Sequence, residues 1–130
     1  MNFNDFFARG LHNTLRLSNE TQFSYQNHWK PVYEDTMIDQ WFIGDFMSAE
    51  YTISVSLNQT EKEILKVVVV AAPNIAKAQV IGRSDLGTPL VEITATVDSS
   101  RVSIIANPAS PSVAGAKLIY SANYYCNLDS

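Results

Sequence analysis

The stretch that decides the fold is MSAEYTISVSL at residues 47–57, because apolar and polar side chains alternate along it. A period of two is typical of a β-strand that has one face against a core and the other face in water. The alternation therefore predicts a half-buried strand. Its buried face carries Tyr51, Ile53, Val55 and Leu57.

Six other segments have the composition of β-strands, and turn residues separate them. They cover residues 37–43, 63–71, 78–82, 90–97, 101–106 and 117–125. Residues 98–100, DSS, are few enough to join two of these segments as a hairpin. About seven short strands at this spacing predict an all-β fold, an antiparallel, jelly-roll-like β-sandwich over residues 36–130.

The segment EILKVVVVA at residues 63–71 breaks the alternation, since it contains four consecutive valines. An uninterrupted apolar strand indicates that both of its faces are covered, whereas a two-layer sandwich covers only one. We therefore predict a subunit interface, or a contact with the N-terminal segment, at Val67, Val68, Val69 and Val70. Alternatively, the stem of Lys66 and the small Ala71 and Ala72 make an uncovered face tolerable.

Residues 1–35 differ from the rest because they are rich in Asn and Gln and carry scattered aromatic side chains. We predict that they form an N-terminal arm that docks on a neighbouring subunit or folds back on its own sandwich. Asn4 can cap a short helix with apolar residues at helical spacing, while residues 15–25 can instead form a hairpin. The candidate interface residues of this arm are Phe3, Phe6, Phe7 and Leu11.

Charge and cysteine content argue against several classes of function. The chain has 130 residues and a net charge of −4, and its nine basic residues do not cluster, which argues against nucleic-acid binding. The single cysteine, Cys126, precludes an intrachain disulfide and argues against a thiolate metal site. No apolar stretch reaches the roughly 20 residues that a membrane helix needs, and the first residues do not resemble a secretory signal.

The sequence also lacks a recognisable catalytic or metal-binding motif. No serine lies in a G-x-S-x-G turn, and no glycine-rich loop resembles a phosphate-binding site. His12 and His28 lie far apart in the arm without a neighbouring cysteine, so they do not form a zinc pattern. We therefore predict no catalytic residues, no metal and no cofactor.

Exposed aromatic side chains offer an alternative function, the binding of carbohydrate. Sandwich proteins stack such rings on sugar faces, and the candidate residues are Trp41, Tyr124 and Tyr125. Because Tyr124 and Tyr125 are adjacent in one predicted strand, their side chains must point to opposite faces of the sheet.

Five stretches carry a resemblance to a known family. They are DQWFIGDFMSAEYTISVSLN (39–58), EKEILKVVVVAAPN (61–74), IGRSDLGTPLVEITATV (81–97), RVSIIANP (101–108) and KLIYSANYY (117–125). Together they resemble small virion structural proteins of contractile-tailed cyanophages and related marine phages, whose β-module recurs in tail-fibre-like and decoration-like proteins.

This resemblance implies a β-sandwich without enzymatic activity, which is made in the bacterial host cytoplasm and built into the virion. It also implies assembly into a symmetric homo-oligomer and contact with other virion structural proteins, in a tail, neck, fibre-adaptor or head-decoration position. Under the alternative, the module contacts host surface glycans. Neither a nucleic acid nor a membrane is expected as a partner.

Overall fold

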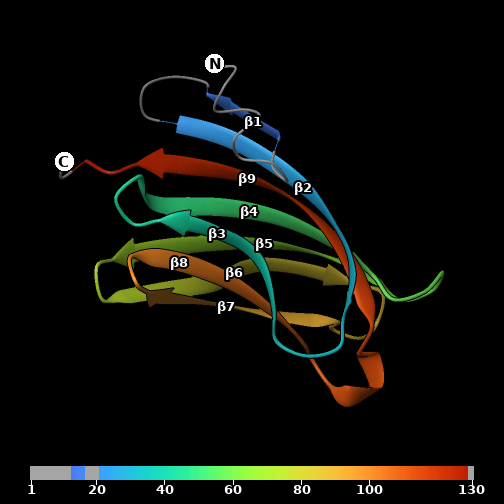
Figure 1. Cartoon of the computed structure of the whole chain (residues 1–130). Coiled ribbons are helices and arrows are strands. Elements are labelled where there is room, and N and C mark those ends of the chain that lie inside the picture. Colours follow the sequence, from blue (N-terminus) through green and yellow to red (C-terminus); the bar gives the residue numbers. More distant parts are fainter. Residues whose placement is uncertain (1–12, 17–20, 129–130) are drawn as a thin grey trace.

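The computed structural model describes residues 13–16 and 21–128, and in them the chain is built almost entirely from β-strands (Figure 1). One short 3-10 turn, η1 (Pro111–Val113), interrupts the strands. The strands are β1 (Asn13–Arg16), β2 (Thr21–Val32), β3 (Thr36–Phe42), β4 (Phe46–Ser56), β5 (Lys62–Ala72), β6 (Ile75–Asp85), β7 (Val91–Asp98), β8 (Arg101–Pro108) and β9 (Ala116–Cys126).

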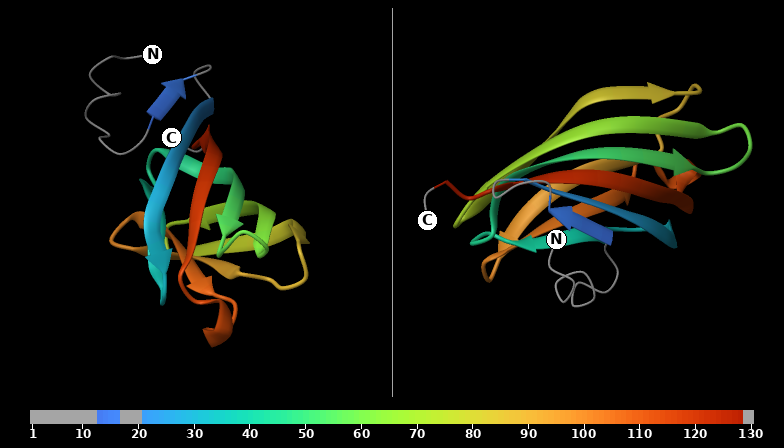
Figure 2. Two further views of the ribbon diagram at one scale, coloured as in Figure 1. Left: turned by 90° about the vertical axis from the view of Figure 1, so that its right-hand side faces the viewer. Right: turned by 90° about the horizontal axis from the view of Figure 1, so that it is seen from above.

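The strands form two antiparallel sheets that face each other. The larger sheet has the order β1-β2-β9-β4-β5-β6, and the smaller sheet has the order β3-β8-β7. Figure 2 shows the two layers from two further directions, with long strands of the larger sheet bending along their length. The predicted all-β antiparallel sandwich is therefore confirmed, and its seven predicted strands correspond to β3–β9.

β1 and β2 lie within the segment that we assigned to an N-terminal arm. β1 pairs with β2, and β2 pairs along β9 from Thr21 opposite Tyr125 to Val32 opposite Ala116. Val32 is fully buried in the core of the sandwich. Docking of residues 1–35 on a neighbour stays a prediction, and its candidate residues Phe3, Phe6, Phe7 and Leu11 lie outside the described part of the chain.

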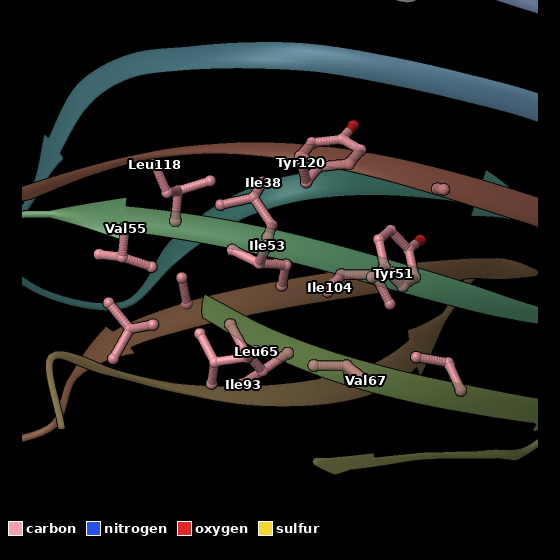
Figure 3. Packing of buried hydrophobic residues seen from close by; sticks show 14 of the residues in the cluster. Ile38, Tyr51, Ile53, Val55, Leu65, Val67, Ile93, Ile104, Leu118 and Tyr120 are labelled. Atoms are coloured by element: carbon pink, nitrogen blue, oxygen red, sulfur yellow. The ribbon is translucent and has the colours of Figure 1, made fainter. Parts of the chain in front are cut away.

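The core lies between the two sheets and is filled by the predicted faces of the alternating strands. Tyr51, Ile53 and Val55 of β4 are at most 3% exposed, as their alternation predicts. Figure 3 shows residues of β4 and β5 packed against Ile93 of β7 and Ile104 of β8. Burial of each large apolar side chain contributes about 1.5–3 kcal/mol, so this layer is the main source of stability.

The predicted interface strand β5 alternates in the structure although its sequence does not. Val67 and Val69 are 0% and 2% exposed inside the chain's own core, whereas Val70 is 60% exposed on the outer face. Successive side chains of a strand must point to opposite faces, so four valines in a row cannot all lie on one surface. The prediction of Val67 and Val69 as partner contacts is therefore corrected, while Val68 and Val70 remain candidates.

Two local irregularities shape the sheets. The predicted hairpin at residues 98–100 is present, with Asp98 paired to Arg101 and both Ser99 and Ser100 at positive φ. Such a two-residue turn matches the twist of the strands that it joins. In β6, Lys66 pairs with Gly82 and Val67 with Val80, so that Ile81 is an extra residue in a β-bulge.

Candidate functional site

The predicted sugar-binding aromatics are mostly buried. Trp41 and Tyr124 are 5% and 4% exposed between the two sheets, which leaves no ring face for a sugar. Their assignment to sugar contact is corrected on this ground, because stacking requires an accessible ring. Tyr125 lies on the outer face of the larger sheet, on the opposite side from Tyr124, as the alternation of β9 predicts.

Trp41 and Tyr124 belong to a buried hydrogen-bonded cluster around Asp39. The hydroxyl groups of Tyr51 and Tyr124 each donate to Oδ2 of Asp39 over 2.6 Å, and the indole N–H of Trp41 donates to the Tyr51 oxygen over 3.1 Å. Asp39 and Trp41 come from β3, whereas the tyrosines come from β4 and β9. The cluster therefore joins the smaller sheet to the larger one.

Burial raises the pKa of two core tyrosines. The pKa of Tyr51 lies well above 10.0 because burial disfavours the phenolate, and the Asp39 carboxylate adds to this effect. The pKa of Tyr120 is raised by the same two causes, with burial again the larger. Both side chains therefore stay neutral in the folded protein at a pH where an unfolded chain ionises.

Alkaline pH is therefore expected to unfold the protein. Because the folded pKa values exceed the unfolded value of 10.0, the stabilisation is complete below pH 10 and is lost progressively above it. Each tyrosine is expected to lower the free energy of unfolding by about 1.4 kcal/mol per pH unit in that range. Urea unfolding between about pH 8 and pH 11 measures the slope, and a Tyr120→Phe variant should show a smaller one. Equal slopes in the two proteins would contradict the assignment.

A second buried polar group, Glu63, fixes the connection between β6 and β7. Its carboxylate forms an ion pair with Arg83 and accepts hydrogen bonds from the backbone N–H groups of Leu90 and Val91. Arg83 also donates to the carbonyl of Val91 over 2.9 Å. The bulge at Ile81 makes this contact possible, since it shifts the alternation of β6 and turns Arg83 inward.

Both buried acids are enclosed in the sandwich, at 3% exposure for Asp39 and 5% for Glu63. A substrate cannot reach them, so they act in stability. The outer face of the larger sheet, in contrast, has two accessible hollows that are lined by polar and apolar side chains.

The smaller hollow, of about 320 Å³, lies over β9, β4, β5 and β6 and contains Tyr125. The Tyr125 hydroxyl donates to the carboxylate of Glu50, and this hydrogen bond is the largest cause of a raised Tyr125 pKa. Val68, Val70, Lys77 and Gln79 are among the other residues that line it. Tyr125 is thus the one predicted sugar contact that remains accessible.

The larger hollow is a groove of about 800 Å³ that follows β9, β4 and β5 at the other end of the same face. Ser56 lies between Lys117 and Lys62, and Ser54 lies between Ile119 and Ile64. Sequence reasoning did not identify these residues, because the lysines and isoleucines come from strands far apart in the chain. Only the register of three strands brings them together.

Among residues 13–16 and 21–128, no three His, Cys, Asp or Glu side chains gather closely enough to hold a metal ion. The same residues contain no helix with the length and hydropathy of a membrane span.

No protein-family model and no curated protein matches the sequence. The solved structures with a similar fold include three phage tailspikes. The tailspike of Acinetobacter phage vB_ApiP_P1 has 13% identity and a TM-score of 0.50, over 81% of this chain and 21% of the tailspike. The tailspike of Acinetobacter baumannii phage AM24 has 12% identity and a TM-score of 0.47, over 81% of this chain and 25% of the tailspike.

The third structure is the tailspike of Acinetobacter baumannii bacteriophage Fri1, with 9% identity and a TM-score of 0.46 over 96% of this chain and 21% of the tailspike. That tailspike is a capsular polysaccharide depolymerase. The prediction of a protein without enzymatic activity is contradicted by this comparison. The chain spans between a fifth and a quarter of the length of the three tailspikes, and at these identities the likeness concerns the fold.

Proposed function

We propose that this chain is a β-sandwich module of a phage tail protein and that copies of it assemble through the outer face of β5 and β6. The carrying observation is a set of apolar side chains on β5 and β6 that the single chain leaves at least partly exposed. We call it the β5–β6 surface, and it consists of Val68, Val70, Ile75 and Ile81, with Lys77 and Gln79 between the two isoleucines along β6. Val70, Ile75 and Ile81 are 60%, 69% and 54% exposed in the single chain.

The position of β6 at the edge of the larger sheet supports assembly. None of its residues is buried, and it runs from Ile75 to Asp85 without a proline. Long edge strands with exposed apolar side chains present unpaired backbone groups and tend to associate with another chain. Lys77 and the bulge at Ile81 give limited protection, so a neighbouring subunit is the cover that we propose.

A phage tail as the setting draws on two separate likenesses. The sandwich is similar to part of the vB_ApiP_P1 tailspike, and the sequence resembles virion structural proteins of cyanophages. We also propose that the protein is located in the virion and contacts other virion structural proteins there. The likeness to cyanophage proteins in particular stays a prediction, since the three matched tailspikes come from Acinetobacter phages.

A double variant tests the proposed assembly. Val70→Asp with Ile81→Asp places two charges in the β5–β6 surface, and we expect an oligomeric wild-type protein to become monomeric. Light scattering coupled to size-exclusion chromatography gives the mass over a wide range of concentration. The matched control is Thr94→Asp with Thr96→Asp, two exposed positions on β7 of the other sheet. A monomeric wild-type protein, or an unchanged mass of the double variant, would overturn the proposal.

A further inference from the structure

We propose that the groove over β9, β4 and β5 binds a linear glycan whose sugar units carry carboxylates, of the polyhexuronate class. This site goes beyond the proposed assembly, because it lies at the other end of the outer face and uses different residues. The groove has a volume of about 800 Å³ and includes hydroxyl, apolar and cationic side chains in a regular arrangement.

The arrangement follows from the register of three strands. In one row across the sheet, Ser56 is paired with Lys117 on one side and with Lys62 on the other. In the next row, Ser54 is paired with Ile119 and with Ile64. Serine hydroxyls thus line the middle of the groove, and matching side chains flank them. Equivalent positions in adjacent rows lie about 6.8 Å apart along a strand.

The cations indicate the charge of the ligand. Within the described residues the structure has one ion pair, Arg83 with Glu63, so neither Lys62 nor Lys117 is neutralised by a carboxylate. The ammonium group of Lys62 donates to the Ser56 hydroxyl over 2.9 Å, which holds it at the groove. Two exposed lysines beside one serine repel each other, and in a chain with a net charge of −4 they form a locally positive site. An anion between them relieves this repulsion.

The remaining side chains suit a sugar better than an acidic peptide. Ile64 and Ile119 are each 46% exposed and can cover the C–H face of a pyranose ring. Ser54 and Ser84 can exchange hydrogen bonds with ring hydroxyls, because each hydroxyl both donates and accepts. The Ser56 hydroxyl already donates to the Asn58 carbonyl and accepts from Lys62, so its role is to position the lysine. A carboxylate on the sugar then pairs with a lysine, and a polymer can follow the groove along the strands.

Titration with oligogalacturonate and with alginate oligomers tests this site. We expect calorimetry to detect binding that weakens as the salt concentration rises. Lys62→Gln and Lys117→Gln should each weaken it roughly fivefold, which is the size expected for one exposed charge pair. Lys66→Gln is the matched control, an exposed lysine of the same sheet outside the groove, and should leave the affinity unchanged. Urea unfolding checks that all three variants are folded.

Three outcomes overturn the inference. Absence of binding to both uronate oligomers removes the site, and equal binding of a neutral malto-oligosaccharide removes the role of the lysines. Tighter binding of poly-glutamate than of either oligomer assigns the groove to an acidic peptide instead. The mass of the protein is measured in parallel, so that failure of glycan binding and failure of assembly are told apart.

Discussion

Replacing Glu63 with alanine is expected to destabilise the fold by about 3–5 kcal/mol, because it removes one partner of a buried ion pair. The Glu63 side chain is completely buried, while that of Arg83 is 23% exposed. Alanine leaves the guanidinium without its counter-ion and removes the acceptor for the N–H groups of Leu90 and Val91. A buried donor without an acceptor costs about 1–3 kcal/mol by itself.

Urea unfolding gives the free energy of each variant, and two controls separate charge from hydrogen bonding. Glu63→Gln keeps an acceptor for Leu90 and Val91 and should cost less than alanine. The double variant Glu63→Leu with Arg83→Met removes both charges, so it should recover the part of the loss that comes from the unpaired guanidinium and keep the part that comes from the N–H groups of Leu90 and Val91. A Glu63→Ala variant within about 1 kcal/mol of the wild type would contradict the assigned role.

Asp39→Ala is expected to destabilise the protein by about 3 kcal/mol, the second largest effect. The carboxylate accepts the hydroxyls of both Tyr51 and Tyr124, and all three side chains are at most 4% exposed. Removing the acceptor leaves two phenolic groups that must find other partners or lose their hydrogen bonds, at about 1–3 kcal/mol each. Relief from burying a carboxylate offsets a part of that cost.

Paired substitutions test whether the cluster acts as one unit. Asp39→Asn keeps a single acceptor oxygen and should lose less stability than alanine. Tyr51→Phe and Tyr124→Phe, combined with Asp39→Ala, remove the orphaned hydroxyls, so the triple variant should be more stable than Asp39→Ala alone. If the triple variant is the least stable of the set, Asp39 does not stabilise the fold by accepting hydrogen bonds from the two tyrosine hydroxyls.

The alternating strands could be predicted from the sequence with their correct faces. In β4, Tyr51, Ile53 and Val55 are buried, and in β9 Tyr124 and Tyr125 separate to opposite faces. Such strands have one buried face and one solvent-exposed face, and the alternation of apolar and polar residues identifies the buried one. The four consecutive valines of β5 do not alternate with polar residues, so the sequence does not identify the buried face. All four were therefore assigned to an interface, although two of them are in the core.

Irregular pairing is what the sequence did not reveal. A bulge between Met37 and Asp39 lets Ile38, Asp39 and Trp41 all lie in the core, so Trp41 was mistaken for a surface ring. The pairing of β2 with β9 was not predicted either, because backbone hydrogen bonds make this pairing and amino-acid composition does not reveal them. The groove depends on register as well, since Lys62 and Lys117 become neighbours only when β4 lies between their strands.

The extra residue in β6 limits how this strand can change in length. Arg83 meets the carboxylate of Glu63 only while Ile81 occupies the bulge. Deletion of Ile81 would restore the regular alternation of β6 and turn the Arg83 side chain outward. The carboxylate of Glu63 would then stay buried without its counter-ion. A deletion at the bulge of β6 is therefore expected to destabilise the protein.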